Sequence, residues 1–366
     1  MGEGVLPHRG STVATEARAP QQVSRLRGFY GAGVVPWIGR LLVLLVLVWL
    51  AVNLAKTPSD FVSVFLEGIT LGLVYGLVAL GYSLVYGILE LINFAHGDVF
   101  MLGSWMSLYI GVTTIGLSAS SGAGTLAWGL AATMLAAMAF CGLLNATIER
   151  IAYRPLRNAP RLAPLITAIG ASFILQDVGL NRLGPAPVSL PNILPQGTVF
   201  SVGGNNYHWY SLIVALSTLP VLTLLVWLVQ RTRQGRAMRA VAQDQEAAAM
   251  MGINVNGTIS FTFLLAGSLA GVAGLLYALY STNIQFDQGF TLGLIAFTAA
   301  VLGGIGNLPG AVLGALLIGL IQQFNEGLSW HSPGSDWTQS IVFAILILIL
   351  VFRPEGLLGE RTPEGG

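Results

Sequence analysis

Long apolar runs alternate with short polar segments along most of the chain. A helix needs about 20 apolar residues to cross the hydrocarbon of a bilayer, and most of the runs approach or reach that length. The pattern predicts an all-α fold, a polytopic transmembrane bundle of eight to ten helices, some short or broken. The count stays open because 291–324 fits two full crossings or two shorter broken helices. The runs cover about 41–55, 61–87, 99–116, 125–146, 163–180, 210–230, 260–280, 291–302, 310–324 and 341–352.

The two ends of the chain differ from this pattern. Residues 1–38 are polar, rich in Arg, Gly and Pro, and lack apolar periodicity, which predicts a disordered cytoplasmic tail. The transmembrane domain is expected to span 39–355, and residues 356–366 are expected to form a cytoplasmic C-terminal tail. A signal peptide is the competing interpretation of the first 55 residues, but 51–55 offers no small-x-small cleavage site.

Composition supports a membrane protein. Hydrophobic residues make up 54% of the chain and charged residues 9%, and the mean hydropathy is +0.73. A soluble domain carries about 25% charged residues, so lipid must solvate much of this chain. The single cysteine, Cys141, excludes an internal disulfide and lies in an apolar run, where a small buried hydrophobe is expected.

Arginine clusters predict the orientation in the membrane, because cytoplasmic loops carry the excess of basic residues. Two crossings separate the second cluster from the third, so all three can lie inside. The loop 181–209 has one Arg and is expected outside, and ten spans would place both termini in the cytoplasm. The clusters are Arg9, Arg18, Arg25, Arg27 and Arg40; Arg150, Arg154, Arg157 and Arg161; and Arg231, Arg233, Arg236 and Arg239.

Glycines repeat at every fourth position in several runs, for example Gly68, Gly72 and Gly76. Small residues at this spacing let two helix backbones approach closely within lipid. Tight helix packing is therefore favoured over a direct role with substrate.

One polar group interrupts the apolar pattern between the second and third runs. Asn93, His96 and Asp98 fall within six residues, at the expected cytoplasmic end of a span. Polar residues inside a membrane are costly and often functional, so these three are candidates for a substrate path or gate at a helix break. The alternative is structural: Asp98 would cap the next helix. The two interpretations are compatible.

A second polar group is expected on the outside. Asn283, Gln285 and Asp287 would line the substrate entrance, or form a solvated turn in which Asp287 caps a helix. Glu67, Gln176 and Asp177 are further polar positions near span ends, for which interhelical hydrogen bonds are the favoured role.

The cytoplasmic stretch 244–253 predicts a short helix between two spans. Asp244 is a good N-cap, three alanines favour helix, and Gly252 is a natural stop. Ala247, Met250 and Met251 share one apolar face of this helix. A helix of two turns is too short to stand alone in water, so it packs either in the groove of a partner protein or on its own membrane domain; physics alone leaves both open.

Motifs of catalysis are absent from the sequence. There is no Gly-x4-Gly-Lys-Ser/Thr loop for ATP and no His-Glu-x-x-His for zinc. The stretch 170–173 lacks the final glycine of the Gly-x-Ser-Gly motif of intramembrane serine proteases. No catalytic residue and no metal site are expected.

Several segments resemble a known family. Glu246-Ala247-Ala248-x3-Gly252 matches the core of the cytoplasmic coupling loop of ABC importer permeases, although the later Leu-Pro of that motif is not evident. More specific are the stretches 72–81, 84–87 and 92–98, together with 153–157, 168–170, 235–240, 303–307 and 309–311. Together they resemble the LivH-type permease of branched-chain amino-acid transporters over about 58–355.

The resemblance implies a function and partners. The chain would be a permease subunit in a bacterial cytoplasmic membrane, paired with a LivM-type permease. Two cytoplasmic ATP-binding subunits would bind the nucleotide, so the chain itself needs no cofactor, and a soluble binding protein would deliver leucine, isoleucine or valine. Glu246, Ala247, Ala248 and Gly252 would form the coupling helix in a groove of an ATPase subunit.

Other functions remain open at this point. Related permeases serve other amino acids, amides, urea and sugars. An ion-coupled secondary transporter would instead use Glu67 or Asp98 as its coupling carboxylate. A membrane enzyme is disfavoured by the absent motifs.

Overall fold

The computed structural model describes residues 34–157, 159–160, 162–202, 205–353 and 355–359. The chain divides into two units, Met1–Lys56 and Thr57–Gly366. In the first unit the described element is helix α2 (Val34–Lys56). This helix begins within the range predicted as N-terminal tail, and the rest of that tail lies outside the described residues.

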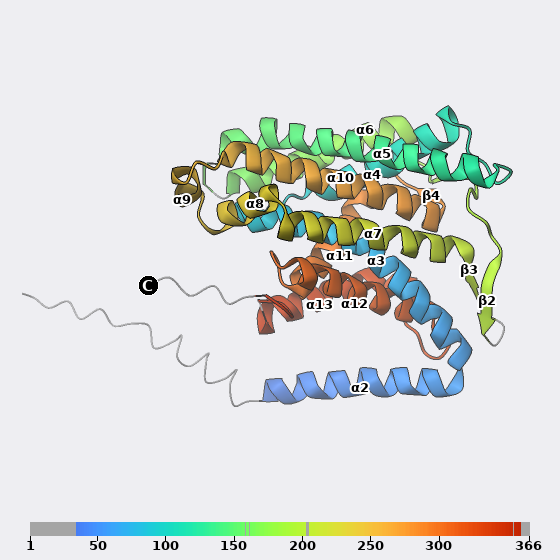
Figure 1. Ribbon diagram of the computed structural model, residues 1–366. Helices are drawn as coiled ribbons and strands as arrows, with labels where there is room; N and C mark the ends of the chain where they lie inside the picture. Colours follow the sequence, from blue (N-terminus) through green and yellow to red (C-terminus); the bar gives the residue numbers. More distant parts are fainter. Residues whose placement is uncertain (1–33, 158, 161, 203–204, 354, 360–366) are drawn as a thin grey trace, which may run out of the picture. The chain divides into compact units, whose positions relative to one another are not determined.

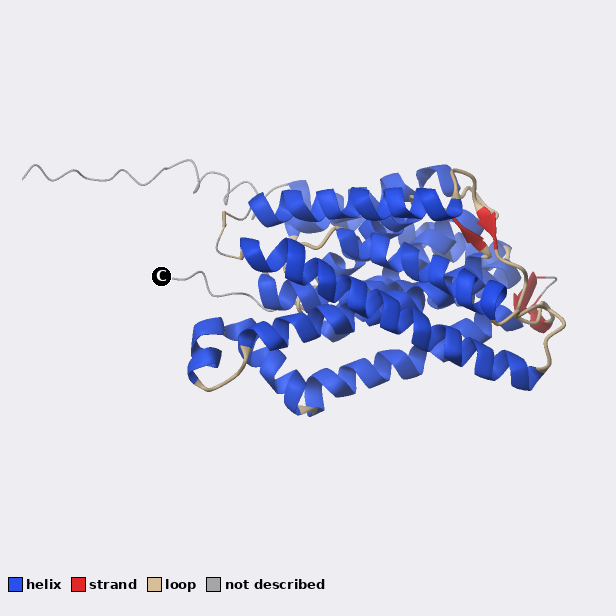
Figure 2. Ribbon diagram, turned by 90° about the horizontal axis from the view of Figure 1, so that it is seen from above, coloured by secondary structure: helices blue, strands red, loops and turns tan. Residues whose placement is uncertain are grey.

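Over its described residues the second unit is a helix bundle with four short strands (Figures 1 and 2). Strand β1 pairs antiparallel with β4, and β2 pairs antiparallel with β3. The elements are α3 (Pro58–Leu89), α4 (Ala95–Ser107), the π-helix η1 (Leu108–Thr114), α5 (Ala123–Ile148), the π-helix η2 (Glu149–Tyr153), the 3-10 helix η3 (Arg154–Leu156), α6 (Leu162–Leu183), β1 (Val188–Ser189), β2 (Thr198–Val202), β3 (Asn205–His208), α7 (Trp209–Arg231), α8 (Arg233–Gln243), α9 (Gln245–Met250), α10 (Val255–Ser281), β4 (Asn283–Ile284), α11 (Gln288–Gly303), α12 (Leu308–Gly327) and α13 (Ser335–Phe352).

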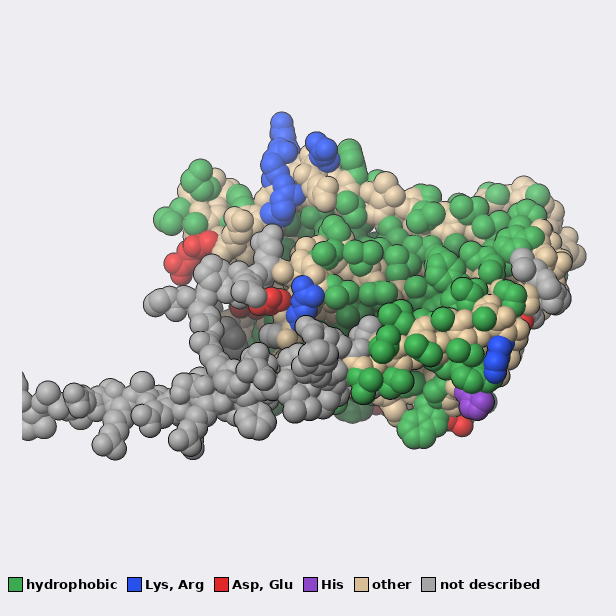
Figure 3. All heavy atoms as spheres, turned by 90° about the horizontal axis from the view of Figure 1, so that it is seen from below, with side chains coloured by type: hydrophobic (Ala, Val, Ile, Leu, Met, Phe, Trp, Pro, Cys, Tyr) green, Lys and Arg blue, Asp and Glu red, His purple; other side chains and the backbone are tan. Residues whose placement is uncertain are grey.

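The long helices of this unit run side by side, and its two ends differ (Figure 1). Helices α8 and α9 lie at one end, which we call the α9 end. The four strands lie at the opposite end, which we call the strand end (Figure 2). The face drawn in Figure 3 is hydrophobic over much of its area, and the charged side chains seen there gather towards its ends.

Seven of the described helices are long and apolar enough to cross a membrane: α3, α5 with its continuation to Leu156, α6, α7, α10, α12 and α13. The chain is therefore a multi-pass membrane protein with an all-α bundle. Helix α11 has 16 residues and falls short of that length, so the region 291–324 holds one shorter and one spanning helix. The predicted count of eight to ten spans is not confirmed and stays a prediction.

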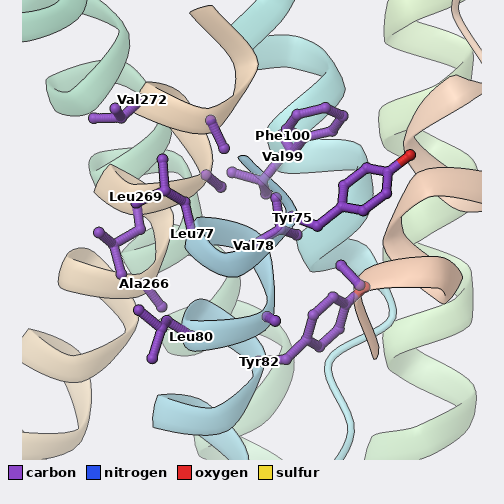
Figure 4. Close-up of a cluster of buried hydrophobic side chains, with 14 of the residues drawn as sticks. Tyr75, Leu77, Val78, Leu80, Tyr82, Val99, Phe100, Ala266, Leu269 and Val272 are labelled. Atoms are coloured by element: carbon purple, nitrogen blue, oxygen red, sulfur yellow. The ribbon is translucent and has the colours of Figure 1, made fainter. Parts of the chain in front are cut away.

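Helices α3 and α10 form the core of the second unit and are buried over most of their lengths. Figure 4 shows Leu77 and Leu80 of α3 towards Ala266 and Leu269 of α10. Residues on several sides of α3 are buried, so its sequence is apolar all round, as expected for a central membrane helix.

Glycines bring the backbones close together, as their spacing predicted. A Cβ atom on Gly72 of α3 would lie 2.8 Å from the Cα atom of Leu316 in α12. On α10, a Cβ atom on Gly274 would lie 2.6 Å from the carbonyl oxygen of Phe100 in α4. Any larger residue at either position would force two helices apart.

The last described residues fold back on the end of α11 and on the turn that leads to α12. The backbone N–H groups of Leu357 and Leu358 donate to the carbonyl oxygens of Leu302 and Gly303 at 2.8 and 2.9 Å. The side-chain amide of Asn307 donates to the carbonyl oxygen of Leu358 at 2.7 Å. Residues 356–359 of the predicted C-terminal tail thus pack on the bundle, and residues 360–366 lie outside the described part.

Candidate functional site

Local sequence builds the short helix α9 as predicted. The Asp244 carboxylate accepts hydrogen bonds from the backbone N–H groups of Glu246 and Ala247 at 2.8 and 2.9 Å, which caps the first turn. At the other end Gly252 has a φ of +83°, a left-handed conformation that favours glycine. The chain then turns into α10, which Asn254 caps through the N–H of Gly257.

Helix α9 is anchored to the membrane bundle on one side and uncovered on the other. Ala248 is only 5% exposed, and the side-chain amide of Gln245 donates to the carbonyl oxygen of Ile88, the penultimate residue of α3, at 3.2 Å. Met250 and Met251 are each 83% exposed, and Glu246 is also exposed. On the predicted apolar face of Ala247, Met250 and Met251, the two methionines are therefore exposed. Ala248, in contrast, packs against the bundle.

Arginines concentrate at the α9 end of the second unit. Among its described residues one arginine, Arg182 at the end of α6, lies at the strand end. The described arginines of the α9 end are Arg150, Arg154, Arg157, Arg231, Arg233, Arg236, Arg239 and Arg353.

Asn93 belongs to a chain of buried hydrogen bonds near this end. The Tyr153 hydroxyl donates to Asn93 Oδ1 at 3.0 Å, and Asn93 Nδ2 donates to Asn145 Oδ1 at 3.2 Å. Asn145 Nδ2 then donates to the carbonyl oxygen of Phe263 at 2.7 Å. These hydrogen bonds join the α3–α4 connection, η2, α5 and α10, so Asn93 lies between helices and not on an open surface.

His96 and Asp98 are both fully buried in the first turns of α4. The His96 ring lies edge-on to Tyr82 of α3, with ring centroids 4.8 Å apart. Asp98 accepts a hydrogen bond from the hydroxyl of Ser172 in α6.

The prediction that Asp98 caps α4 is wrong. The helix already begins at Ala95, so Asp98 is its fourth residue and its side chain bonds to α6. Gln176, a predicted interhelical contact, donates to the Ser172 hydroxyl at 3.2 Å on its own helix.

Asn283, Gln285 and Asp287 lie together at the strand end, between α10 and α11. Asn283 belongs to β4 and its side chain accepts a bond from the Ser189 hydroxyl of β1 at 3.0 Å. The backbone N–H of Gln285 donates to the side chain of Gln288 at 3.1 Å. Asp287 is exposed and occupies the N-cap position of α11, but its side chain makes no capping bond.

A tract of hydrogen-bonded polar side chains extends from the strand end into the middle of the bundle, and most of it was missed by sequence reasoning. Glu67 of α3 accepts the hydroxyl hydrogen bond of Ser211 in α7 at 2.8 Å, which confirms its predicted role between helices. The Tyr75 hydroxyl donates to Gln322 of α12 at 2.9 Å, and Gln322 donates to Glu326 at 3.1 Å. Polar residues near helix ends resemble ordinary interfacial residues in a sequence, so no signal marked this tract.

Glu149 is a second residue that the sequence did not single out. Its carboxylate is fully buried at the start of η2, pairs with the Arg157 guanidinium and accepts the Ser260 hydroxyl at 2.6 Å. Arg157 also donates to Asn256 Oδ1 at 2.6 Å. This cluster ties the end of α5 to the start of α10. The sequence signal that could have identified Glu149 is its position, because it is a carboxylate directly after an apolar run.

Nothing in the described part of the chain groups three His, Cys, Asp or Glu side chains as a metal site would require.

Comparison with known proteins decides the family. The sequence profile of the family described as branched-chain amino acid transport system, permease component, matches residues 64–351. The permease protein BraD of the high-affinity branched-chain amino acid transport system of Pseudomonas aeruginosa is 39% identical over 301 residues, which cover 81% of this chain and 95% of BraD. The chain belongs to this permease family.

Other relatives agree with this assignment. The LivH permease protein of Escherichia coli K12 is 38% identical over 310 residues, which cover 83% of this chain and 97% of LivH. A more distant relative is the autoinducer 2 import system permease protein LsrD of Klebsiella pneumoniae, 27% identical over 286 residues, or 74% of this chain and 80% of LsrD. These relatives are transport permeases. No solved structure matches the chain.

Proposed function

We propose that this chain is a permease subunit of an ABC importer and forms, with a LivM-type partner permease, the membrane path for branched-chain amino acids. The names of BraD and LivH support the solute, because both relatives match nearly their whole length. LsrD carries the name of a different import system, so another small solute, such as another amino acid, an amide or urea, is the alternative.

The proposed assembly contains further subunits. Two cytoplasmic ATP-binding subunits supply the energy, and a soluble binding protein delivers the solute to the strand end. ATP is bound by the partner subunits, so this chain takes part without a cofactor of its own.

Helix α9 carries the proposal. Two exposed methionines next to an exposed glutamate offer a soft apolar surface to a groove in an ATPase subunit, because methionine side chains adapt to irregular surfaces. Glu246, Ala247, Ala248 and Gly252 are the proposed coupling residues: Glu246 faces the partner, Ala247 and Ala248 keep α9 close to the bundle, and Gly252 allows the return into α10. Movement of the ATPase would pass through α9 to α3, α8 and α10, which it touches.

Orientation follows from the arginines. Because basic residues are retained in the cytoplasm, the α9 end faces the cytoplasm and the strand end faces outward. We infer the same side for both termini, in a bacterial inner membrane.

The polar groups are proposed parts of the path. Asn283, Gln285 and Asp287 flank the outer entrance. Asn93, His96 and Asp98 are buried, so they would act as a gate by fixing the position of α4 and not by contact with solute in this conformation.

The test changes α9 itself. In Glu246→Arg the charge facing the ATPase is reversed, and in Gly252→Trp a left-handed position receives a bulky side chain. We expect both variants to insert in the membrane but lose co-purification with the ATPase subunits. Gln234→Arg, an exposed position on α8, is the matched control. Unchanged co-purification of both α9 variants would reject the coupling assignment.

An ion-coupled secondary transporter is the second function class. It would use Glu67 or Asp98, which bond to Ser211 and Ser172. Membrane vesicles that contain this chain alone, with a proton gradient and no ATPase, distinguish the two: we expect no uptake.

A further inference from the structure

A groove lies between α5 and α10 near the α9 end of the bundle, with a volume of about 300 Å³. Its polar side is lined by Thr147, Arg150 and Ser260, and its apolar side by Leu143, Phe261 and Leu264. Nothing in the proposed coupling or solute path uses it.

Arg150 places an unneutralised charge at this groove. The neighbouring carboxylate, Glu149, is fully buried: it pairs with Arg157 and accepts the hydroxyl hydrogen bond of Ser260 in the groove lining, so Arg157 already balances its charge. Within the described part of the chain, Arg150 itself makes no ion pair with an acidic side chain. The groove therefore lacks an anion to balance its charge.

The wall next to this charge is apolar and open. Leu143 is 63% exposed and Leu264 is 36% exposed. Leu143 and Thr147 of α5 and Arg150 of η2, which continues α5, are spaced by four and three residues, so they follow one side of this helix. Seven residues of helix span about 10 Å, so the groove runs from a cation at the α9 end towards the hydrophobic middle of α5.

We propose that the groove binds an anionic phospholipid of the cytoplasmic leaflet, with Arg150 contacting the phosphate and an acyl chain lying along Leu143, Phe261 and Leu264. Basic pockets between transmembrane helices on the cytoplasmic side are suited to acidic headgroups. The lipid would brace the junction that Glu149, Arg157 and Ser260 already form between α5 and α10.

The experiment titrates the delipidated full-length chain with phosphatidylglycerol and with phosphatidylcholine, and counts retained lipids by native mass spectrometry. We expect retention of phosphatidylglycerol over phosphatidylcholine. Arg150→Gln should weaken that retention by about five-fold, since one basic residue near a membrane surface contributes at that level. Arg231→Gln, an exposed arginine at the same end on α7, is the matched control and should retain the lipid as the unchanged chain does.

Further measurements distinguish the phosphate of a lipid headgroup from free inorganic phosphate. Excess inorganic phosphate should neither displace phosphatidylglycerol nor raise the melting temperature, whereas Ala146→Trp, which fills the groove, should weaken lipid retention with Arg150 in place. Equal retention by Arg150→Gln and Arg231→Gln would overturn the proposal. So would displacement by free phosphate, which indicates a plain anion site, or crosslinking of Thr147 to the partner permease in the assembled importer, which indicates that a protein covers the groove.

Discussion

The side-chain amide of Gln245 donates a hydrogen bond to the backbone carbonyl of Ile88 across 3.2 Å. This bond joins the first residue of α9 to the last turn of the central helix α3. The short helix is thus connected to the buried core by a side chain as well as by its chain neighbours.

Gln245→Ala removes this link and should uncouple α9 from α3. We expect the ATPase subunits to co-purify as before, because the exposed side of α9 is intact, while the solute transported per ATP hydrolysed falls several-fold. Paired transport and hydrolysis assays in proteoliposomes measure the ratio. Gln243→Ala, an exposed residue at the end of α8, is the control. An unchanged ratio in Gln245→Ala would show that force reaches α3 by another route.

Arg157→Gln should destabilise the protein strongly, because it leaves the Glu149 carboxylate buried without its cation. Breaking a buried ion pair from one side costs about 3 kcal/mol, and the Arg157 side chain is only 16% exposed. Thermal unfolding in detergent should show a clear loss for this variant and little change for the exposed Arg154→Gln. The double change Glu149→Gln with Arg157→Gln should recover part of the loss; no recovery would mean that the charge is not the cause.

Asn145→Ala should also lower stability, since it leaves the Asn93 amide and the Phe263 carbonyl without their partner. A buried polar group left unpaired costs about 1–3 kcal/mol. Tyr153→Phe removes one hydroxyl from the end of the same chain of bonds, and we expect a smaller effect. Thr223→Ala, whose exposed hydroxyl bonds only within α7 to the carbonyl of Leu219, serves as the reference in the same unfolding assay. A Tyr153→Phe effect larger than that of Asn145→Ala would contradict this order.

Gly72→Leu should prevent correct packing of α3 against α12. A Cβ atom at this position would meet backbone atoms at 2.8 and 3.0 Å, which no side-chain rotation can relieve. Gly170→Leu on α6 has nothing within 4 Å of its Cβ position and should be tolerated. Size-exclusion chromatography and the yield of folded protein compare the two variants, and similar yields would show that α3 and α12 do not approach as closely as described.

Sequence reasoning succeeded where the cause is local. Asp244 and Gly252 mark the ends of α9 because capping and a left-handed turn depend on a few neighbouring residues. The glycine spacing also predicted close helix packing, since glycine lacks a side chain whatever residues surround it. Family membership was recognisable from short stretches such as 92–98.

Tertiary partners could not be predicted in the same way. The Asp98 carboxylate bonds to a serine 74 positions later, and Asn145 bonds to the backbone 118 positions later. Packing of the whole bundle decides which helices are neighbours. The sequence pattern predicts where each helix lies along the chain, but not which other helices it contacts. For the same reason Glu149 and the groove beside Arg150 were not foreseen.

The contact of Leu357 and Leu358 with Leu302 and Gly303 has a consequence for biosynthesis. These leucines leave the ribosome more than 50 residues after the turn that they bind. The end of α11 therefore gains these backbone hydrogen bonds only after α12 and α13 have been translated. A nascent chain stalled in α13 would lack these two backbone bonds, and the last carbonyl groups of α11 would be left without those partners.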